Sequence, residues 1–186
     1  MCEILKKRAY VCFSSLNGGM TMLALIEKID NEYVAQFNRS LNHAVEQVWA
    51  VLTENDKLAR WMPNLYVENL RKGGIIKFDM MDGSGNFIDI NILDCQVNSV
   101  LEFTWGEDRV RFEVHKNPDG CLLILKEFIH EINEHTPKDL SGWHICLEIF
   151  SAVLDGHDMD FPKDEWEKWY KRYKLVINKI ENNDLN

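Results

Sequence analysis

The sequence predicts an α+β fold in which a curved antiparallel sheet wraps around one long helix near the carboxyl end. Two observations predict it. Six short segments of alternating apolar and polar residues follow one another between residues 65 and 130, with turn residues between them. The stretch from Asp139 to Gly156 then repeats apolar residues at helical spacing around most of its circumference. Because such a helix must be covered on nearly all sides, we expect the sheet to curve around it.

The bulk composition is that of a globular domain with a full core. The chain has 186 residues, of which 46% are hydrophobic and 27% charged. Its net charge of -9 argues against a nucleic acid or an anionic membrane surface as partner. No run approaches the roughly 18 apolar residues of a membrane span. The five cysteines are scattered and form no C-x-x-C pair, so we expect no metal site, no disulfides and a cytoplasmic location. We also find no phosphate-binding or dinucleotide motif and expect no cofactor.

The first 21 residues differ in character from the rest. A basic cluster is followed by serine, asparagine and glycine residues rather than by a continuous apolar segment, which is unlike a signal peptide. A glycine pair stands just ahead of Met20 and Met22, and two glycine codons can spell a ribosome-binding site. We therefore expect residues 1–21 to be a non-native or disordered extension, and residues 22–186 to form a single domain.

The elements follow in a simple order. A first strand is predicted over residues 33–41, where Val34, Ala35 and Phe37 stand among polar residues and β-branched and aromatic residues are enriched. A helix is predicted over residues 42–54, with Asn42 as its N-cap, and a turn closed by Pro63 comes next. Six strands are then predicted over residues 65–70, 75–81, 87–93, 101–105, 110–114 and 121–130. Glycine-containing turns at residues 82–86 and 117–120 separate two pairs of these strands, which indicates an antiparallel meander.

The long helix is predicted to present one narrow polar stripe to water. The stripe consists of His144, Glu148, Ser151 and Asp155, and the apolar arc contains Trp143, Cys146, Leu147, Phe150, Val153 and Leu154. Gly142 lies within this helix, where a glycine costs on the order of 1 kcal/mol relative to alanine. We therefore expect another element to pack closely against Gly142. A last helix over residues 163–180 is aromatic on one side and is expected to pack over the same body.

Several motifs occur in an order that resembles a known family. Val48-Trp49 in the first helix is followed by Trp61-Met62-Pro63, then by Gly142-Trp143, and then by an L-x6-L-D-G segment at residues 147–156. This pattern resembles the activator of heat-shock-protein-90 ATPase homologue-like family, over roughly residues 32–180. The resemblance implies the helix-grip fold of the START-like (SRPBCC) superfamily. That superfamily binds lipids, polyketides, flavonoid-like and other apolar compounds, and includes aromatase/cyclases and a chaperone activator, so the resemblance leaves function open.

Aromatic and methionine residues supply the candidate binding site. Singly, each is more typical of a packed core, but as a set they suit the wall of an apolar cavity between the sheet and the helix. The predicted ligand-binding residues are Trp49, Trp61, Met62, Phe78, Met80, Phe103, Trp105, Phe112, Trp143, Leu147 and Phe150. Cys146, on the apolar arc, is expected to be an inert thiol. His144 is interpreted as a histidine that is solvated or ion-paired with Glu148, and His115, His130 and His135 lack a cluster of further ligands, so no catalytic residue is predicted.

Three functions fit these observations. The first is non-enzymatic binding of a small apolar molecule such as a lipid, a flavonoid-like or a polyketide-like compound. The alternative, implied by the family name alone, is a protein-interaction role with a chaperone. The third is an aromatase/cyclase-like enzyme, which needs ionisable groups that point into the cavity. The cavity volume and the directions of Arg109, Arg111 and Glu127 distinguish the three.

Overall fold

The computed structural model describes residues 9–10 and 23–184. The expected N-terminal extension lies outside the described residues except for Ala9–Tyr10. In the described part of the chain, the strands are β1 (Ala9–Tyr10), β2 (Leu25–Ile29), β3 (Glu32–Leu41), β4 (Leu65–Val67), β5 (Ile75–Asp79), β6 (Phe87–Gln96), β7 (Val100–Trp105), β8 (Asp108–Asn117) and β9 (Gly120–Ile129). The helices described are α1 (Val45–Thr53), α2 (Asn55–Leu58), α3 (Thr136–Leu154) and α4 (Lys163–Asp184).

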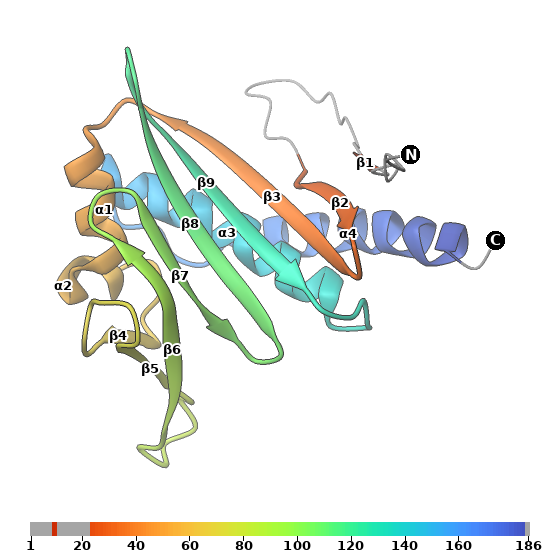
Figure 1. The fold of residues 1–186 in the computed structure, drawn as a ribbon, viewed down its shortest axis with the longest axis horizontal. Helices are drawn as coiled ribbons and strands as arrows, with labels where there is room; N and C mark the ends of the chain where they lie inside the picture. The colour runs from red at the N-terminus through yellow and green to blue at the C-terminus, as the bar shows by residue number, and fades with distance from the viewer. Residues whose placement is uncertain (1–8, 11–22, 185–186) are drawn as a thin grey trace, which may run out of the picture.

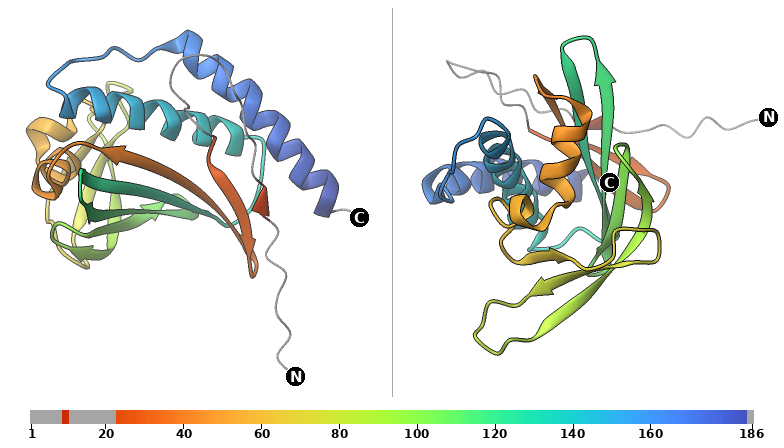
Figure 2. Two further views of the ribbon diagram at one scale, coloured as in Figure 1. Left: turned by 90° about the horizontal axis from the view of Figure 1, so that it is seen from above. Right: turned by 90° about the vertical axis from the view of Figure 1, so that its left-hand side faces the viewer.

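The nine described strands form one antiparallel sheet in the order β1-β2-β3-β9-β8-β7-β6-β5-β4. The sheet curves around α3, and α4 packs against α3 on the side away from the sheet (Figures 1 and 2). Helices α1 and α2 close one end of the curved sheet (Figure 2). The predicted helix-grip architecture is therefore confirmed. No helix within the described residues is long and apolar enough to span a membrane.

Strand β2 is an element that the sequence did not reveal. It pairs with β3 around a tight turn in which Asp30 takes a φ of 55°. Its sequence, LIEKI, contains two charged residues, and within it only Ile26 is fully buried. A strand with so short an alternation gives little periodic signal, because its inward face contributes few residues to the core.

The edge strand β4 is shorter than predicted, and a side chain makes hydrogen bonds to the backbone at its outer edge. It ends at Val67. The Asn55 amide donates to the Val67 carbonyl at 2.9 Å and accepts from the Val67 N–H at 2.7 Å. An uncovered edge strand offers unpaired backbone groups to other chains, so these two hydrogen bonds protect the free edge of the sheet.

Two expectations about exposure are wrong. The β5–β6 hairpin extends beyond the helices (Figure 1), so Met80, which was predicted to line the binding site, lacks a covering layer and is 45% exposed. Conversely, His144 was expected on a solvent-facing stripe but is 0% exposed. The reason is α4, whose Trp169 indole stacks on the His144 ring with the centroids 3.6 Å apart. The periodicity of α3 alone could not show that a second helix covers its polar side.

Candidate ligand-binding cleft

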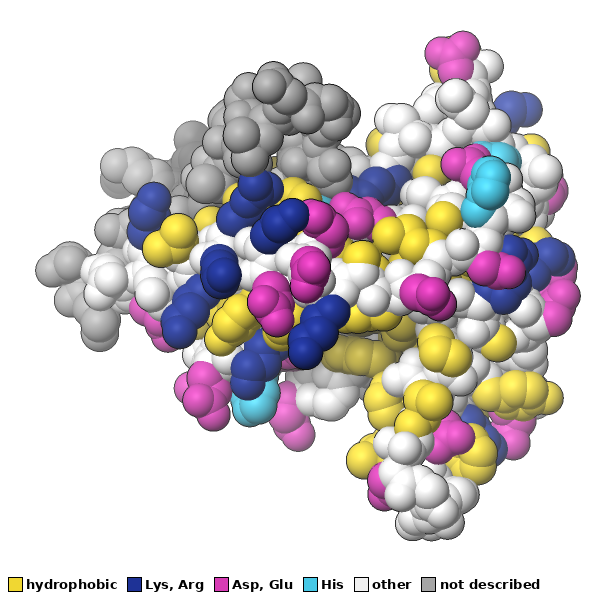
Figure 3. All heavy atoms as spheres, turned by 180° about the vertical axis from the view of Figure 1, so that it is seen from behind, with side chains coloured by type: hydrophobic (Ala, Val, Ile, Leu, Met, Phe, Trp, Pro, Cys, Tyr) yellow, Lys and Arg dark blue, Asp and Glu magenta, His cyan; other side chains and the backbone are white. Residues whose placement is uncertain are grey.

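A cleft of about 570 Å³ opens at the end of the sheet where the β5–β6 hairpin projects. The turn after α2, strands β5 and β7, the part of α3 from Lys138 to Ile149 and the α3–α4 connection form its walls. Its apolar lining consists of Trp61, Met62, Pro63, Phe78, Met81, Trp105, Trp143, Cys146, Ile149, Met159 and Phe161, with Gly142 among them, and its polar lining of Arg60, Asn64, Lys138, Asp139 and Asp160. Figure 3 shows the molecule hollowed between the helices and the projecting hairpin, with hydrophobic side chains around the hollow.

Trp61 forms the most firmly held wall of the cleft. Its indole Nε1 donates to the Val51 carbonyl at 2.9 Å, which ties the turn after α2 back to α1. The ring packs edge-on against Phe150 of α3 and Phe112 of β8, with centroids 5.1 and 6.2 Å away. Because the hydrogen bond and two aromatic contacts fix this ring, the cleft keeps its shape on this side without a ligand.

Trp105 and Trp143 form a second part of the lining. Their ring centroids lie 5.2 Å apart, and Trp105 also packs edge-on against Phe78 of β5 at 5.7 Å. These three residues come from β7, α3 and β5, so the wall exists only where the sheet curves toward the helix. Aromatic rings at the wall of a cleft favour a flat apolar ligand.

Gly142 lies on α3 and faces the cleft. A Cβ atom built at this position meets no atom within 4 Å, and Gly142 lines the cleft. The expectation that another element packs closely against Gly142 is therefore wrong. The absent side chain instead leaves open space in front of Trp143, because any larger residue would project into the cleft.

Within the described residues, the space between the sheet and α3 around Phe103 and Phe112 is filled rather than hollow. The predicted residues Trp49, Phe103, Phe112, Leu147 and Phe150 are buried in the core. The void left among Phe103, Phe112 and their neighbours measures about 10 Å³, which is at most one water molecule. The interior itself thus has no room for a ligand at this place, and the cleft lies outside it.

The structure brings together part of the predicted set. Trp61, Met62, Phe78, Trp105 and Trp143 line the cleft. Trp49, Met80, Phe103, Phe112, Leu147 and Phe150 do not, since five of them fill the core and Met80 lies on the projecting hairpin. Sequence reasoning missed Met159 and Phe161, in the α3–α4 connection. Two large apolar residues in a segment without regular structure were the available signal.

The mouth of the cleft carries charges of both signs. Arg60 is paired with Asp158, with Nη2 2.8 Å from Oδ1. Lys138 and Asp139 stand next to each other at the start of α3, and burial raises the pKa of the Asp139 carboxyl. Polar groups confined to the rim of an apolar cleft orient a ligand more than they hold it.

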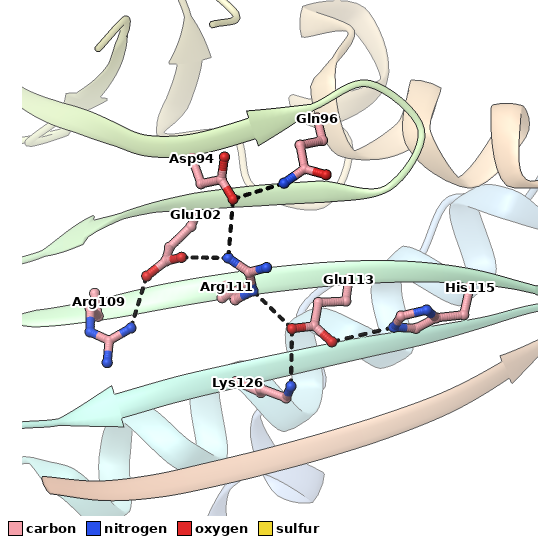
Figure 4. Close-up of polar contacts among 8 residues, drawn as sticks. All are labelled: Asp94, Gln96, Glu102, Arg109, Arg111, Glu113, His115 and Lys126. Carbon is pink, nitrogen blue, oxygen red and sulfur yellow. Dashed lines mark hydrogen bonds and ion pairs between the residues drawn. The ribbon is translucent and has the colours of Figure 1, made fainter. Parts of the chain in front are cut away.

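Arg109 and Arg111 point away from the cleft, on the face of the sheet turned away from α3 (Figure 4). Arg111 contacts Glu102 at 2.6 Å and Glu113 at 2.8 Å, and Arg109 contacts Glu102 at 2.8 Å. Hydrogen bonds from Arg111, Lys126 and His115 lower the pKa of Glu113 to about 2 although burial opposes them. These side chains satisfy one another and are not available to bind a ligand in the cleft.

Glu127 is an ionisable residue that points from the sheet toward α3. It is 1% exposed and accepts a hydrogen bond from Trp143 Nε1 at 3.2 Å. Burial, reinforced by Asp139 and Asp108, raises its pKa to about 8. An inward acid is what the enzymatic hypothesis required, but Trp143 lines the cleft and Glu127 does not.

Cys146 faces the apolar side as predicted. Its Sγ lies 3.5 Å from the Sδ of Met62, and burial raises the pKa of the thiol to about 12. At this pKa almost no thiolate forms at neutral pH, so Cys146 contributes to the cleft as an apolar group.

Comparison with known proteins agrees with this architecture. The family model described as Activator of Hsp90 ATPase homolog 1-like protein matches residues 42–155. A search of curated proteins finds no significant match. Among solved structures, a conserved protein of unknown function, EF2215 from Enterococcus faecalis, superposes with a TM-score of 0.71 at 23% identity, over 83% of this chain and 88% of that one.

A second similar structure is CalU16 from Micromonospora echinospora, with a TM-score of 0.61 at 16% identity, over 92% of this chain and 98% of that one. A third is MLL2253 from Mesorhizobium loti, with a TM-score of 0.56 at 18% identity, over 68% of this chain and 99% of that one. At these identities the likenesses establish the fold. Together with the family match over more than half of its length, they show that this chain belongs to the Activator of Hsp90 ATPase homolog 1-like family.

Proposed function

We propose that this protein binds a small hydrophobic molecule in the cleft between the end of the curved sheet and α3. The observation that carries the proposal is the open space of about 570 Å³ walled by Trp61, Trp105 and Trp143. A volume of this size is within the range of small-molecule sites, which are mostly apolar with a few polar groups. Burial of apolar ligand surface there is worth roughly 25 cal/mol per Å².

The experiment uses Gly142 to fill the cleft without disturbing the core. The uncharged hydrophobic dye Nile red is titrated into the wild type, Gly142→Ala and Gly142→Leu. An isobutyl group that removes about 60 Å² of apolar contact costs about 1.5 kcal/mol, so we expect Gly142→Leu to weaken the dye about ten-fold. Gly142→Ala is the matched control, because it adds one methyl group at the same position and should bind within about two-fold of the wild type.

Thermal unfolding separates blocking from misfolding in the same variants. Alanine is favoured over glycine inside a helix by about 1 kcal/mol, and nothing obstructs a Cβ at Gly142, so Gly142→Ala should melt higher than the wild type. If Gly142→Leu is folded and binds the dye as well as Gly142→Ala does, the cleft is not the binding site. Native mass spectrometry of protein from its own host then identifies the class of any natural ligand.

A protein-interaction role is the second candidate, and the projecting hairpin favours it. Met81 is 67% exposed, and Met80, Phe87 and Ile88 are also exposed near it. Exposed apolar residues gathered on one feature are typical of contact sites with other proteins. Substitution of Phe87 and Ile88, which do not line the cleft, by serine should abolish capture of a protein partner while leaving dye binding in the cleft unchanged.

A further inference from the structure

Glu127 places a buried carboxyl group among apolar residues of the sheet. It lies on β9 in alternation with the buried Leu125 and Ile129 and faces the α3 side of the sheet. Its partners across the sheet are Ala35 of β3 and Val110 of β8, which are apolar. Burial of a polar group among apolar neighbours is costly unless hydrogen bonds compensate, and a leucine would fit the same pattern. The carboxyl group is therefore expected to serve a specific contact.

That contact is the hydrogen bond from Trp143. Oε1 of Glu127 accepts from the indole Nε1 at 3.2 Å, whereas Oε2 is buried without a hydrogen-bond partner among the described residues. The charged and titratable groups that act on Glu127 are Asp139 from α3, Asp108 from β8 and Tyr173 from α4. None of these is a cation, so the environment favours the neutral acid, in which Oε1 remains an acceptor for the indole N–H.

Trp143 transmits this contact to the cleft. One part of its indole is fixed by Glu127, while the ring lines the cleft and packs against Trp105 at 5.2 Å and Phe112 at 6.2 Å. The indole plane therefore decides how far the wall extends in front of Gly142. Without an acceptor at position 127, the buried indole N–H would lose its hydrogen-bond partner. The cost of this unsatisfied donor would favour a rotated orientation of the ring.

We propose that Glu127 is a positioning residue of the cleft, which holds the indole of Trp143 in the orientation that the ligand contacts. This inference rests on the proposed binding function and names the residue behind the wall of the same site. Glu127 touches no ligand itself. Glu127 affects binding only by way of the orientation of Trp143. The ionisation of Glu127 is expected to change the indole signal of Trp143.

The test compares Glu127→Gln with Glu127→Leu. Glutamine keeps an acceptor oxygen for the indole, and leucine fills a similar volume without one. In ¹H–¹⁵N spectra, the Trp143 indole signal, assigned by its loss in Trp143→Phe, should keep its position in Glu127→Gln and shift in Glu127→Leu. In the wild type it should titrate with a midpoint near pH 8, and in Glu127→Gln it should not. The loss of one hydrogen bond changes an equilibrium constant by about two- to ten-fold. We therefore expect Nile red to bind Glu127→Leu about five-fold more weakly than the wild type.

The outcomes separate the two proposals. If Glu127→Leu leaves both the Trp143 indole signal and the dye affinity unchanged, the positioning role is overturned. If Nile red does not bind the wild type, the binding function fails. The indole signal then decides the contact on its own, since a shift in Glu127→Leu with rescue in Glu127→Gln still shows that Glu127 holds Trp143.

Discussion

The hydroxyl oxygen of Tyr173 lies 3.1 Å from Nδ1 of His144, in the interface between α4 and α3. The Ala24 N–H donates to the same oxygen at 3.0 Å, so the proton of the hydroxyl group is free to point at Nδ1. His144 is then neutral, with its own proton on Nε2, 3.6 Å from Glu148 Oε1. Burial, with Arg39 and Arg172 nearby, lowers the pKa of His144 to about 2. One hydroxyl group thus joins α3, α4 and the segment that precedes β2.

Tyr173→Phe should destabilise the protein by about 1–3 kcal/mol. The change leaves the Ala24 N–H and the His144 Nδ1 buried without their common partner, which costs more than the loss of one exposed hydrogen bond. Urea denaturation at neutral pH measures the effect. Tyr170→Phe is the control, because Tyr170 lies one turn earlier on α4 and stacks on Trp166 through its ring. Equal stability of the two variants would contradict this account.

Glu127→Gln should remove a decline in stability between pH 4.5 and pH 8. Burial raises the pKa of Glu127 from 4.5 to about 8 in the folded protein. Between these values the folded state keeps a proton that the unfolded state has lost, so stability falls as pH rises through this window. Urea denaturation at pH 5, 6.5 and 8 should therefore show a steeper decline for the wild type than for Glu127→Gln. The exposed Glu107→Gln should decline as the wild type does, and equal slopes in all three proteins would be inconsistent with a protonated Glu127.

Glu113→Gln should act on the acid side. Burial alone would raise the pKa of Glu113, but hydrogen bonds from Arg111, Lys126 and His115 outweigh it and lower the pKa from 4.5 to about 2. The stability that the carboxylate contributes is present above pH 4.5 and is lost as pH falls toward 2. At pH 7 the variant should be less stable by about 1 kcal/mol, because the network is partly exposed to solvent. The difference should shrink between pH 4.5 and pH 2, whereas Glu131→Gln, at an exposed position, should match the wild type throughout.

Asn55→Ala should weaken the edge of the sheet. The amide of Asn55 makes two hydrogen bonds with the backbone of Val67, and their loss should cost about 1–2 kcal/mol, since water replaces part of them. Light scattering on incubation at raised temperature should also increase, because β4 would then present free backbone groups. Asn69→Ala, at an exposed site just beyond β4, is the control. An unchanged melting temperature in Asn55→Ala would show that the amide does not protect the edge.

Local pattern was enough to place most of the elements. The alternation of Leu101, Phe103 and Trp105 predicted β7, and the residues with odd numbers in this strand do face the core or the cleft. The spacing of Trp143, Leu147 and Phe150 predicted the buried arc of α3, and all three are buried. These predictions succeeded because the period of a strand or helix determines which side chains share a face, whatever lies opposite.

Only the tertiary structure shows which element packs against each face of a strand or helix. His144 belongs to a polar stripe by its spacing, yet α4 covers it. Met80 shares a face with Ile76 by its spacing, yet the helices end before they reach it. Phe112 and Phe150 are of a residue type that commonly lines apolar pockets, yet their contact with Trp61 fills the space between them.

By itself, the sequence determined the fold class, the α3 face that the sheet covers and five of the residues that line the cleft. Periodicity is a property of neighbours along the chain, so these features could be predicted from it. The tertiary structure decided that the ligand-sized space is a cleft at the end of the sheet rather than a cavity within it, that Gly142 opens onto this space, and that Glu127 stands behind Trp143. Each of these depends on distances between segments far apart in the sequence, which no local pattern contains.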